Sequence, residues 1–390
     1  MAKTAMEGNQ AVAYAMRQVR PDVVAAYPIS PQTEVVQAFA DHVAAGEVDT
    51  QYVAVESEHS AMSACVGSAA AGARTMTASA SQGIALMWEV LYIAAGLRLP
   101  IVMAVINRAL SANINIHCDH SDSMGCRDTG WLQIYAEDVQ EGYDNIIQAV
   151  KIAERCDLPV MACLDGYILS HAMESLDIIE DDKVYDFVGS IKSEHSLLDL
   201  QHPVTFGPID MTDYYFEHKR QQLAAFDGVL DVIKEVGQQY GRLSGRPYGL
   251  FEAYRLEDAD YGILAMGSAA GTTKDVIDDY RQQGKKVGLL KLRVFRPFPT
   301  AELADAVSHL KALAVLDRAS SPGAAGGPLF LEVTSALYAK KANVPVLPYI
   351  YGLGGREFGP HLVERVYAEL PAVAGDGKVQ YPVRYLGVRE

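Results

Sequence analysis

Short runs of apolar residues alternate with longer stretches of helical periodicity through about the first 170 residues. The apolar runs predict β-strands at residues 22–26, 51–55, 74–78, 100–106 and 159–163. The stretches between them are amphipathic or rich in alanine, and they predict helices at residues 34–45, 57–73, 84–97 and 139–155. Strands that alternate with helices of this length predict a parallel sheet with helices on both of its faces.

A second alternation of the same kind begins near residue 261. It predicts strands at 261–266, 286–292, 312–317 and 344–350, with helices at 271–283, 300–308 and 327–339. The interval 177–260 carries charge runs and scattered tyrosines, and we expect an irregular extension of the first domain followed by a linker. The pattern therefore predicts an α/β protein of two domains, residues 1–240 and 241–390, each with a parallel sheet covered by helices.

The composition is that of an ordinary globular protein, with 49% hydrophobic and 21% charged residues in a chain of 390. The net charge of −16 argues against a nucleic acid or an anionic membrane surface as a partner. The longest apolar run, residues 99–106, is far shorter than a membrane-spanning helix, and the N-terminal MAKTAMEGNQ has no apolar signal core. We therefore expect a cytoplasmic protein.

Five cysteines occur in the chain, an odd number with none in C-x-x-C spacing. This pattern excludes a disulfide framework and an iron–sulfur cluster of the usual ligand spacing within this chain. A chain of this length also buries a large enough core to fold without disulfides. Both points fit a reducing compartment.

Polar and small residues follow each strand of the first alternation, where a parallel sheet binds ligands. The fourth strand is followed by Arg108 and the fifth by Asp165. The turns after the first three strands contribute Pro28, Ile29, Ser30, Glu56, Glu58, Ser81, Gln82 and Gly83. A hydroxyl, a carboxylate, a small-residue turn and a guanidinium thus meet at one edge, which predicts a site for a polar or anionic organic molecule.

Each of these residues also has a simpler structural explanation. Ser30 stands where it could cap the following helix. One of Glu56 and Glu58 is expected to complement a helix dipole, and Arg108 could form a surface ion pair. For no single residue is a role in binding favoured over its simpler structural explanation, but the coincidence of four such groups at one edge favours a binding site.

Residues 116–126 contain two histidines, two cysteines and two aspartates, which are metal-ligand types. H-x-x-H beside C-x7-C matches no zinc template, so a polar loop with local hydrogen bonds is favoured and no metal is expected in this chain. The chain also lacks G-x-G-x-x-G, the phosphate-binding G-x-x-x-x-G-K-[ST] and the G-x-S-x-G elbow.

Several of these segments resemble the alpha subunits of the 2-oxoacid:ferredoxin oxidoreductase family, in its pyruvate synthase branch. In the first half the resemblance lies in YPISPQTE, VESEHSAMSA, GARTMTASASQGIALM, LRLPIVMAVINRALSA and DHSDSMGCRDTGW. In the second half it lies in MGSAAGTTKDVI, LRVFRPFP and VLDRASSPGAAGGPLFLEV. The match stays in register across nearly the whole chain.

The resemblance implies a pyrimidine-type domain of the thiamine diphosphate fold, followed by a domain like the C-terminal domain of transketolase. It implies thiamine diphosphate shared with a diphosphate-binding beta subunit that holds Mg²⁺, because the motif of that side, G-D-G followed about 25–30 residues later by Asn, does not occur here. It also implies a gamma subunit, a delta subunit and [4Fe-4S] clusters on partner chains only. Coenzyme A would be a substrate, and ferredoxin would dock on another subunit.

The resemblance also implies roles for individual residues. Glu58 matches the glutamate that hydrogen-bonds the aminopyrimidine ring nitrogen, and Arg108 matches the arginine that pairs with the substrate carboxylate. Ser30 replaces the usual threonine and keeps its hydroxyl beside the 2-oxoacid. The remaining cofactor-binding positions are Pro28, Ile29, Ser81, Gln82 and Gly83. Cys118 and Cys126 depart from the family pattern and are assigned no role.

The function expected from this resemblance is reversible, coenzyme A-dependent oxidative decarboxylation of pyruvate with reduction of ferredoxin. The stretches VESEHSAMSA and DHSDSM favour the pyruvate branch over the same chemistry on 2-oxoglutarate or a branched 2-oxoacid. A cofactor-free scaffolding subunit is a further alternative. Glu58 and Arg108 at neighbouring strand ends argue against it.

Overall fold

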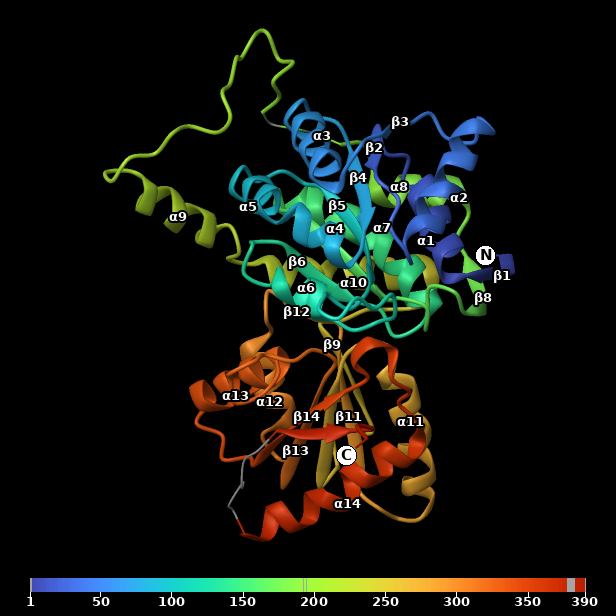
Figure 1. Ribbon diagram of the computed structural model, residues 1–390, viewed down its shortest axis with the longest axis vertical. Helices are drawn as coiled ribbons and strands as arrows, with labels where there is room; N and C mark the ends of the chain where they lie inside the picture. The colour runs from blue at the N-terminus through green and yellow to red at the C-terminus, as the bar shows by residue number, and fades with distance from the viewer. Residues whose placement is uncertain (1, 192, 194, 377–382, 390) are drawn as a thin grey trace.

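The computed structural model describes residues 2–191, 193, 195–376 and 383–389. Two α/β bodies lie one above the other along the long axis, with the N-terminus in the upper body and the C-terminus in the lower one (Figure 1). The predicted α/β class, with helix-covered sheets that are mostly parallel, is confirmed.

The upper body is built on a seven-stranded sheet. Its strands, in spatial order, are β12 (Val294–Arg296), β6 (Leu132–Tyr135), β7 (Val160–Asp165), β5 (Val102–Asn107), β4 (Thr75–Ser79), β2 (Val23–Ala26) and β3 (Gln51–Ala54). All neighbours are parallel except β12, which comes from the second half of the chain and pairs antiparallel with β6. The carboxyl ends of the six parallel strands therefore share one edge.

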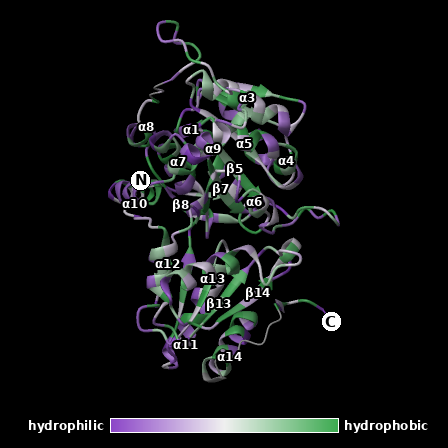
Figure 2. Ribbon diagram, turned by 90° about the vertical axis from the view of Figure 1, so that its left-hand side faces the viewer, coloured by the Kyte–Doolittle hydropathy of each residue, from purple (hydrophilic) through white to green (hydrophobic). Residues whose placement is uncertain are grey.

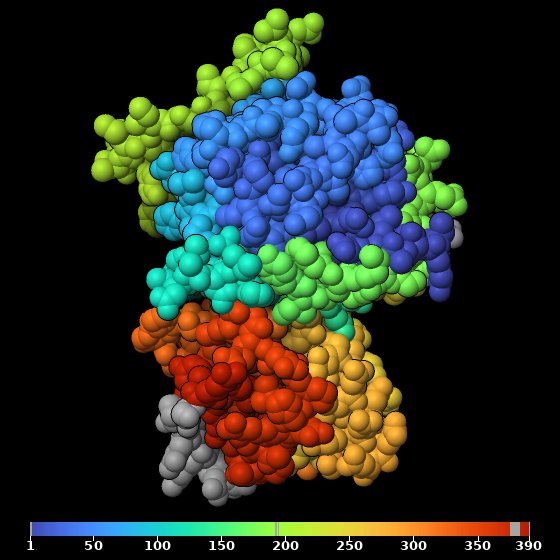
Figure 3. Space-filling model, turned by 45° about the vertical axis from the view of Figure 1, so that its right-hand side comes forward, coloured from blue at the N-terminus to red at the C-terminus, as the bar shows by residue number. Residues whose placement is uncertain are grey.

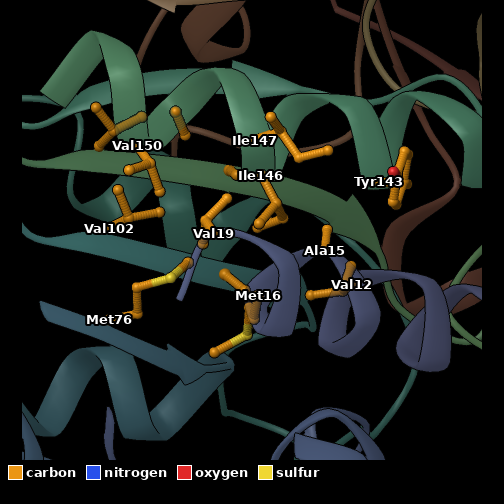
Figure 4. Close-up of a cluster of buried hydrophobic side chains, with 14 of the residues drawn as sticks. Val12, Ala15, Met16, Val19, Met76, Val102, Tyr143, Ile146, Ile147 and Val150 are labelled. Carbon is orange, nitrogen blue, oxygen red and sulfur yellow. The ribbon is translucent and has the colours of Figure 1, made fainter. Parts of the chain in front are cut away.

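Helices cover both faces of this sheet, and its central strands β4, β5 and β7 are therefore buried along their whole length. On one face lie α1 (Gly8–Gln18), α2 (Thr33–Ala44) and α7 (Val139–Cys156). Figure 4 shows Met16 of α1 and Val150 of α7 packed with Val102 of β5. On the other face lie α3 (Glu58–Ala70), α4 (Ser81–Leu86) and α5 (Trp88–Gly96). The short α6 (Ser121–Gly125) follows β5 in the chain.

The lower body has a six-stranded sheet with α11 (Ala269–Gln282) and α14 (Pro360–Asp376) on one face, and α12 (Thr300–Val307) and α13 (Pro328–Lys340) on the other. Its strands in order are β15 (Arg384–Leu386), β14 (Val346–Tyr351), β13 (Ala312–Asp317), β10 (Tyr261–Ala265), β11 (Val287–Leu292) and β9 (Phe251–Tyr254). Only the edge strand β9 is antiparallel to its neighbour. The hydropathy colouring in Figure 2 shows these strands as an apolar layer between helices that carry polar residues.

The interval 177–260 is more regular than expected. It holds the end of β8 (Met173–Ile178), which pairs with β1 (Ala2–Glu7), and the helices α8 (Asp181–Val188), α9 (Tyr215–Ala224) and α10 (Val229–Ser244). Helix α10 buries Ile233, Val236 and Tyr240, which are spaced three and four residues apart and join the upper core. The charge runs of the interval conceal this periodicity, because the opposite face of the helix is polar.

Residues 195–224 form an arm that projects from the upper body (Figures 1 and 3). Helix α9 in this arm has no buried residue. None of the described helices is long and apolar enough to cross a membrane.

Candidate active site

The carboxyl edges of the two sheets face each other. In the upper sheet β5 and β7 end in register at Asn107 and Asp165. Asp165 accepts hydrogen bonds from the backbone N–H (3.0 Å) and the hydroxyl (2.6 Å) of Ser268, which follows β10, and it pairs with Arg318, which follows β13. The boundary between the bodies thus lies at the edge where the predicted site residues were expected.

Glu58 begins helix α3 at this edge. The helix starts here because the side chain of Ser57 accepts the backbone N–H of Ser60 at 3.2 Å, as an N-cap does. Glu56 is exposed and accepts a hydrogen bond from the Ser60 hydroxyl. Glu58 is only 6% exposed and makes no hydrogen bond or ion pair with any described residue. The two carboxylates therefore differ: Glu56 lies before the helix and is already bonded to Ser60, whereas Glu58, the first residue of the helix, is available to a ligand.

Gly83 in the first turn of α4 allows Glu58 to occupy this position. A Cβ atom at Gly83 would lie 2.6 Å from Oε1 of Glu58 and 2.6 Å from Oγ of Ser79. The Ser79 hydroxyl is itself buried and has no hydrogen-bond partner in the described structure. The small-residue turn was expected to let a ligand approach the backbone, and in the structure it is the Glu58 carboxylate that approaches it.

Arg108 and Ser30 are brought together. The Arg108 guanidinium donates from Nη1 to the backbone oxygen of Ser30 and from Nε to that of Asn115, each at 2.9 Å. A guanidinium has five N–H groups, so three remain without a partner among the described residues. Ser30 does not cap helix α2, which begins at Thr33 without a side-chain cap.

The other predicted cofactor residues lie in the turns around this pair. Ser81 Oγ lies 2.6 Å from the backbone oxygen of Ala109, and Gln82 donates to the Ser111 hydroxyl at 2.7 Å, so the turn before α4 is tied to the loop after β5. Pro28 is exposed, and the backbone N–H of Ile29 donates to the Gln32 side chain at 3.2 Å. Ser81 and Gly83 are buried, whereas Pro28 and Ser30 are exposed.

Sequence reasoning missed Asp122, which connects these turns. Its Oδ2 accepts the backbone N–H of Ser81 (3.0 Å) and of Arg108 (2.9 Å), and its Oδ1 accepts Asn107 Nδ2 (2.8 Å) and the backbone N–H of Ser123 (2.7 Å). Burial raises the pKa of Asp122 to about 6, although these hydrogen bonds oppose the shift. The only signal in the sequence was the polar run DHSDSM, because three of the four donors to Asp122 are backbone N–H groups.

Two family models match the chain. The model described as pyruvate flavodoxin/ferredoxin oxidoreductase, thiamine diphosphate-binding, matches residues 14–238, and that of pyruvate:ferredoxin oxidoreductase core domain II matches residues 259–363. Pyruvate synthase subunit PorA of Thermotoga maritima is 52% identical over all 390 residues, which cover 98% of that protein. The chain belongs to the pyruvate:ferredoxin oxidoreductase family. The resemblance drawn from the motifs is thereby confirmed.

Other relatives include subunits named for pyruvate and subunits named for a different 2-oxoacid. PorA of Methanocaldococcus jannaschii is 51% identical over 90% of this chain and 90% of its own length. The ketoisovalerate oxidoreductase subunit VorA of Pyrococcus abyssi is 42% identical over 98% of this chain and 97% of its own length. The chain is thus a subunit of a 2-oxoacid oxidoreductase, and relatives with different substrates share nearly its full length.

Two solved structures share the fold. The 2-oxoglutarate:ferredoxin oxidoreductase of Magnetococcus marinus, with 2-oxoglutarate, coenzyme A and succinyl-CoA bound, superposes with a TM-score of 0.75 at 22% identity. The match covers 94% of this chain, but this chain spans only 65% of that one. A split-gene transketolase, an inactive beta4 tetramer, matches with a TM-score of 0.55 at 14% identity over 95% of this chain.

The residues at the edge fit the cofactor named by the first family model. An aminopyrimidine ring carries a ring nitrogen that can share a proton with a carboxylate. Glu58 is a buried carboxylate without a partner among the described residues, and the neighbouring Ser79 hydroxyl is unpaired there as well. Both groups lie against Gly83, where no side chain intervenes. This arrangement suits a flat polar heterocycle.

Cys118, His120 and Asp165 are the one group of three metal-ligand side chains found within the described residues, with ligand atoms within 4.8 Å of one another. Both oxygens of Asp165 are already engaged, Oδ1 by His120 at 2.7 Å and Oδ2 by Arg318 and Ser268. Burial alone would raise the pKa of Asp165, but Arg318 and His120 hold it well below its ordinary value. Burial raises the pKa of the Cys118 thiol well above its ordinary value. The group is best explained as an ion pair between the two bodies.

Proposed function

We propose that this chain supplies the aminopyrimidine side of a thiamine diphosphate site in an enzyme that converts pyruvate and coenzyme A to acetyl-CoA and CO₂ while reducing ferredoxin. The observation that carries the proposal is Glu58, a buried carboxylate without a partner among the described residues, at the ligand-binding edge of a family domain. Thiamine diphosphate, when bound, supplies a carbon nucleophile that attacks the ketone of a 2-oxoacid.

In this proposal Glu58 holds a proton at the aminopyrimidine ring nitrogen. Because no described residue binds it, its carboxylate can share that proton with the ring. The side chain is buried against Gly83, and burial strengthens such a hydrogen bond relative to water. Ser81, Gln82, Gly83, Pro28 and Ile29 shape the surface around the ring.

Arg108 binds the carboxylate of the 2-oxoacid in this proposal. Two of its five N–H groups are fixed on the carbonyl oxygens of Ser30 and Asn115, which hold the guanidinium in place and leave three donors for a carboxylate. Ser30 is exposed beside it and contributes a hydroxyl toward the same substrate.

The exposure of Pro28 and Ser30 and the missing diphosphate motif support a site completed by other chains. We propose a beta subunit that holds the diphosphate and Mg²⁺, with a gamma subunit, a cluster-carrying delta subunit and ferredoxin docked away from this chain. Among the residues that the structure describes, nine of the 22 exposed large apolar side chains lie in the arm, at residues 197–223. A concentration of this kind is typical of a chain that associates with others.

Pyruvate is the substrate we favour. The two relatives most similar among those named above are PorA subunits, at 52% and 51% identity, against 42% for the ketoisovalerate subunit. A panel of pyruvate, 2-oxoglutarate and 2-oxoisovalerate on the assembled enzyme tests this choice. We also retain residues 1–240 and 241–390 as the two domains, with two exceptions: α10 continues in the upper body to Ser244, and β12 returns to the upper sheet. A cytoplasmic location suits the five unpaired cysteines.

The divided site is tested by calorimetry with thiamine diphosphate and Mg²⁺. The purified chain alone should bind the cofactor weakly or not at all, because a diphosphate needs the metal charge that a partner supplies. The complex copurified without oxygen should contain it. Tight one-to-one binding by the chain alone would contradict the divided site, and an assembled complex without cofactor would favour the scaffolding alternative.

A further inference from the structure

Asp122 is a fully buried carboxylate that no cation contacts in the part of the chain described. It is 1% exposed, and its oxygens accept four N–H groups instead of forming an ion pair. A carboxylate offers about four lone-pair positions on two oxygens, so all of them are used. No neutral side chain of similar size accepts four hydrogen bonds in this way.

These four donors come from three separate segments of the edge. Ser81 lies at the start of α4, Arg108 and Asn107 lie at the end of β5, and Ser123 lies in α6. One oxygen, Oδ2, takes the backbone N–H groups of both Ser81 and Arg108. The carboxylate therefore fixes the distance between the turn that lies against Glu58 and the backbone that carries the guanidinium.

Arg108 is held both at its backbone and at its guanidinium. Its backbone N–H is bound to Asp122, while its guanidinium is bound to the carbonyl oxygens of Ser30 and Asn115. Ser81 has a φ of +47°, a left-handed conformation that residues with a side chain rarely adopt. Its N–H reaches Asp122 in this conformation, so the carboxylate stabilises an otherwise unfavourable backbone.

We propose that Asp122 is a positioning residue for substrate binding, acting through the main chain of Arg108 to set where the guanidinium meets the 2-oxoacid carboxylate. This inference rests on the proposed role of Arg108. A purely structural role would lower the amount of folded enzyme without changing substrate affinity. A positioning role raises KM, because a displaced guanidinium binds the substrate less well even in the molecules that fold.

The test is a double-mutant cycle in the assembled enzyme, with Asp122→Asn, Arg108→Ala and the combined variant. The amide introduced by Asp122→Asn would turn an NH₂ group toward two N–H donors, so the turn and the strand end must move apart. We expect KM for pyruvate to rise on the order of tenfold in Asp122→Asn, with a smaller change in kcat. The Kd for oxamate, an unreactive carboxylate analogue, measured by calorimetry, should rise in parallel. In the Arg108→Ala background, Asp122→Asn should add little to either constant.

Glu154→Gln is the matched control. Glu154 is also a largely buried carboxylate, but it pairs with Arg74 at 2.6 Å, and Arg74 precedes β4 at the opposite edge of the sheet. This variant should lower Tm and leave KM and the oxamate Kd unchanged. If Asp122→Asn fails to assemble, Asn107→Ala, which removes one donor to Oδ1, should raise KM in the same direction by a smaller factor.

Two outcomes overturn the inference while the role of Arg108 stands: a KM and Kd in Asp122→Asn equal to wild type, or losses that add fully to those of Arg108→Ala. An unchanged KM in Asn107→Ala has the same meaning when Asp122→Asn does not assemble. If Arg108→Ala itself leaves KM and Kd unchanged, the proposed role of Arg108 fails, and the inference about Asp122 fails with it.

Discussion

The guanidinium of Arg108 donates a 2.9 Å hydrogen bond to the backbone oxygen of Ser30, a residue 78 positions earlier in the chain. The two residues follow β5 and β2, which are separated in the sheet by β4 alone. Since the three strands are parallel, their carboxyl ends lie at one edge and the turns that follow them can touch. The contact uses the Ser30 backbone, so the Ser30 hydroxyl remains available to a ligand.

Arg108→Lys should impair use of the 2-oxoacid more than it impairs cofactor binding. Lysine carries a single ammonium nitrogen on a flexible stem, so it cannot occupy the positions of both Nε and Nη1 and also present two parallel N–H groups to a carboxylate. Loss of a charge-assisted hydrogen bond of about 1.5–3 kcal/mol corresponds to roughly a ten- to hundredfold fall in kcat/KM. Steady-state kinetics with pyruvate check this, and an unchanged kcat/KM in a normally assembled variant would show that Arg108 does not bind the substrate.

Gly83→Ala should damage both stability and activity. The added Cβ would lie 2.6 Å from Oε1 of Glu58, so the carboxylate or the start of α4 must shift. Overpacking of this kind typically costs about 1–3 kcal/mol. Gly67 is the control, since it lies in the same helix as Glu58 and a Cβ there meets nothing within 4 Å. Gly67→Ala should stabilise the chain by about 0.5–1 kcal/mol and keep full activity.

Thermal unfolding and pyruvate-dependent ferredoxin reduction, measured on both glycine variants, separate the two effects. Full activity in Gly83→Ala would mean that the close packing of Glu58 against α4 does not matter to the chemistry.

The strands that carry the site could be predicted because they are buried on both faces. β5 has only buried residues and reads as one apolar run, and the turn after it begins with Arg108. The choice between Glu56 and Glu58 could not be made from local sequence, because both stand where α3 begins. It is the approach of α4 that buries one of them and leaves the other exposed.

Contacts that backbone groups make, and contacts between segments far apart in the chain, could not be predicted from the sequence pattern. Asp122 acts on the N–H groups of Ser81 and Arg108, and an N–H group has no residue type to recognise. β12 is three residues long and joins a sheet whose other strands lie more than 100 residues earlier. Asp165 was expected at the site, but its pairing with Arg318 depends on how the two bodies meet.

Asp317 should make the free energy of unfolding depend on pH. Burial raises the pKa of Asp317 to about 7, although its carboxylate accepts the backbone N–H groups of Leu329 and Phe330 at the start of α13. In the unfolded chain its pKa is about 4. Between these values the folded state binds a proton that the unfolded state does not, so this group's contribution to stability falls as pH rises from about 4 to 7. The slope is at most about 1.4 kcal/mol per pH unit.

Asp317→Asn removes this contribution and keeps an acceptor for one of the two N–H groups. The difference in unfolding free energy, variant minus wild type, should therefore increase with pH between about 4 and 7. Urea unfolding at several pH values in this range measures it. Parallel curves for the two proteins would mean that Asp317 is ionised throughout.

Glu58→Gln is the variant that bears most directly on the proposed chemistry. Glutamine has nearly the same shape and can still hydrogen-bond, so folding, assembly and cofactor content should survive. It cannot exchange a proton with the aminopyrimidine nitrogen, and general acid–base contributions of this kind are typically about 10²–10⁴-fold. If Glu58 only complemented the helix dipole, the variant would lose about 0.3–1 kcal/mol of stability and keep its activity.

Glu56→Gln is the internal control, two residues away in sequence but exposed and bonded to Ser60. It should be nearly silent in every assay. The measurements are hydrogen–deuterium exchange at the thiazolium carbon of the cofactor and pyruvate-dependent ferredoxin reduction, both in assembled complexes. Hydrogen–deuterium exchange should slow in Glu58→Gln and not in Glu56→Gln, because only Glu58 is buried. Wild-type exchange in Glu58→Gln, or a larger loss in Glu56→Gln, would place the proton transfer on another group.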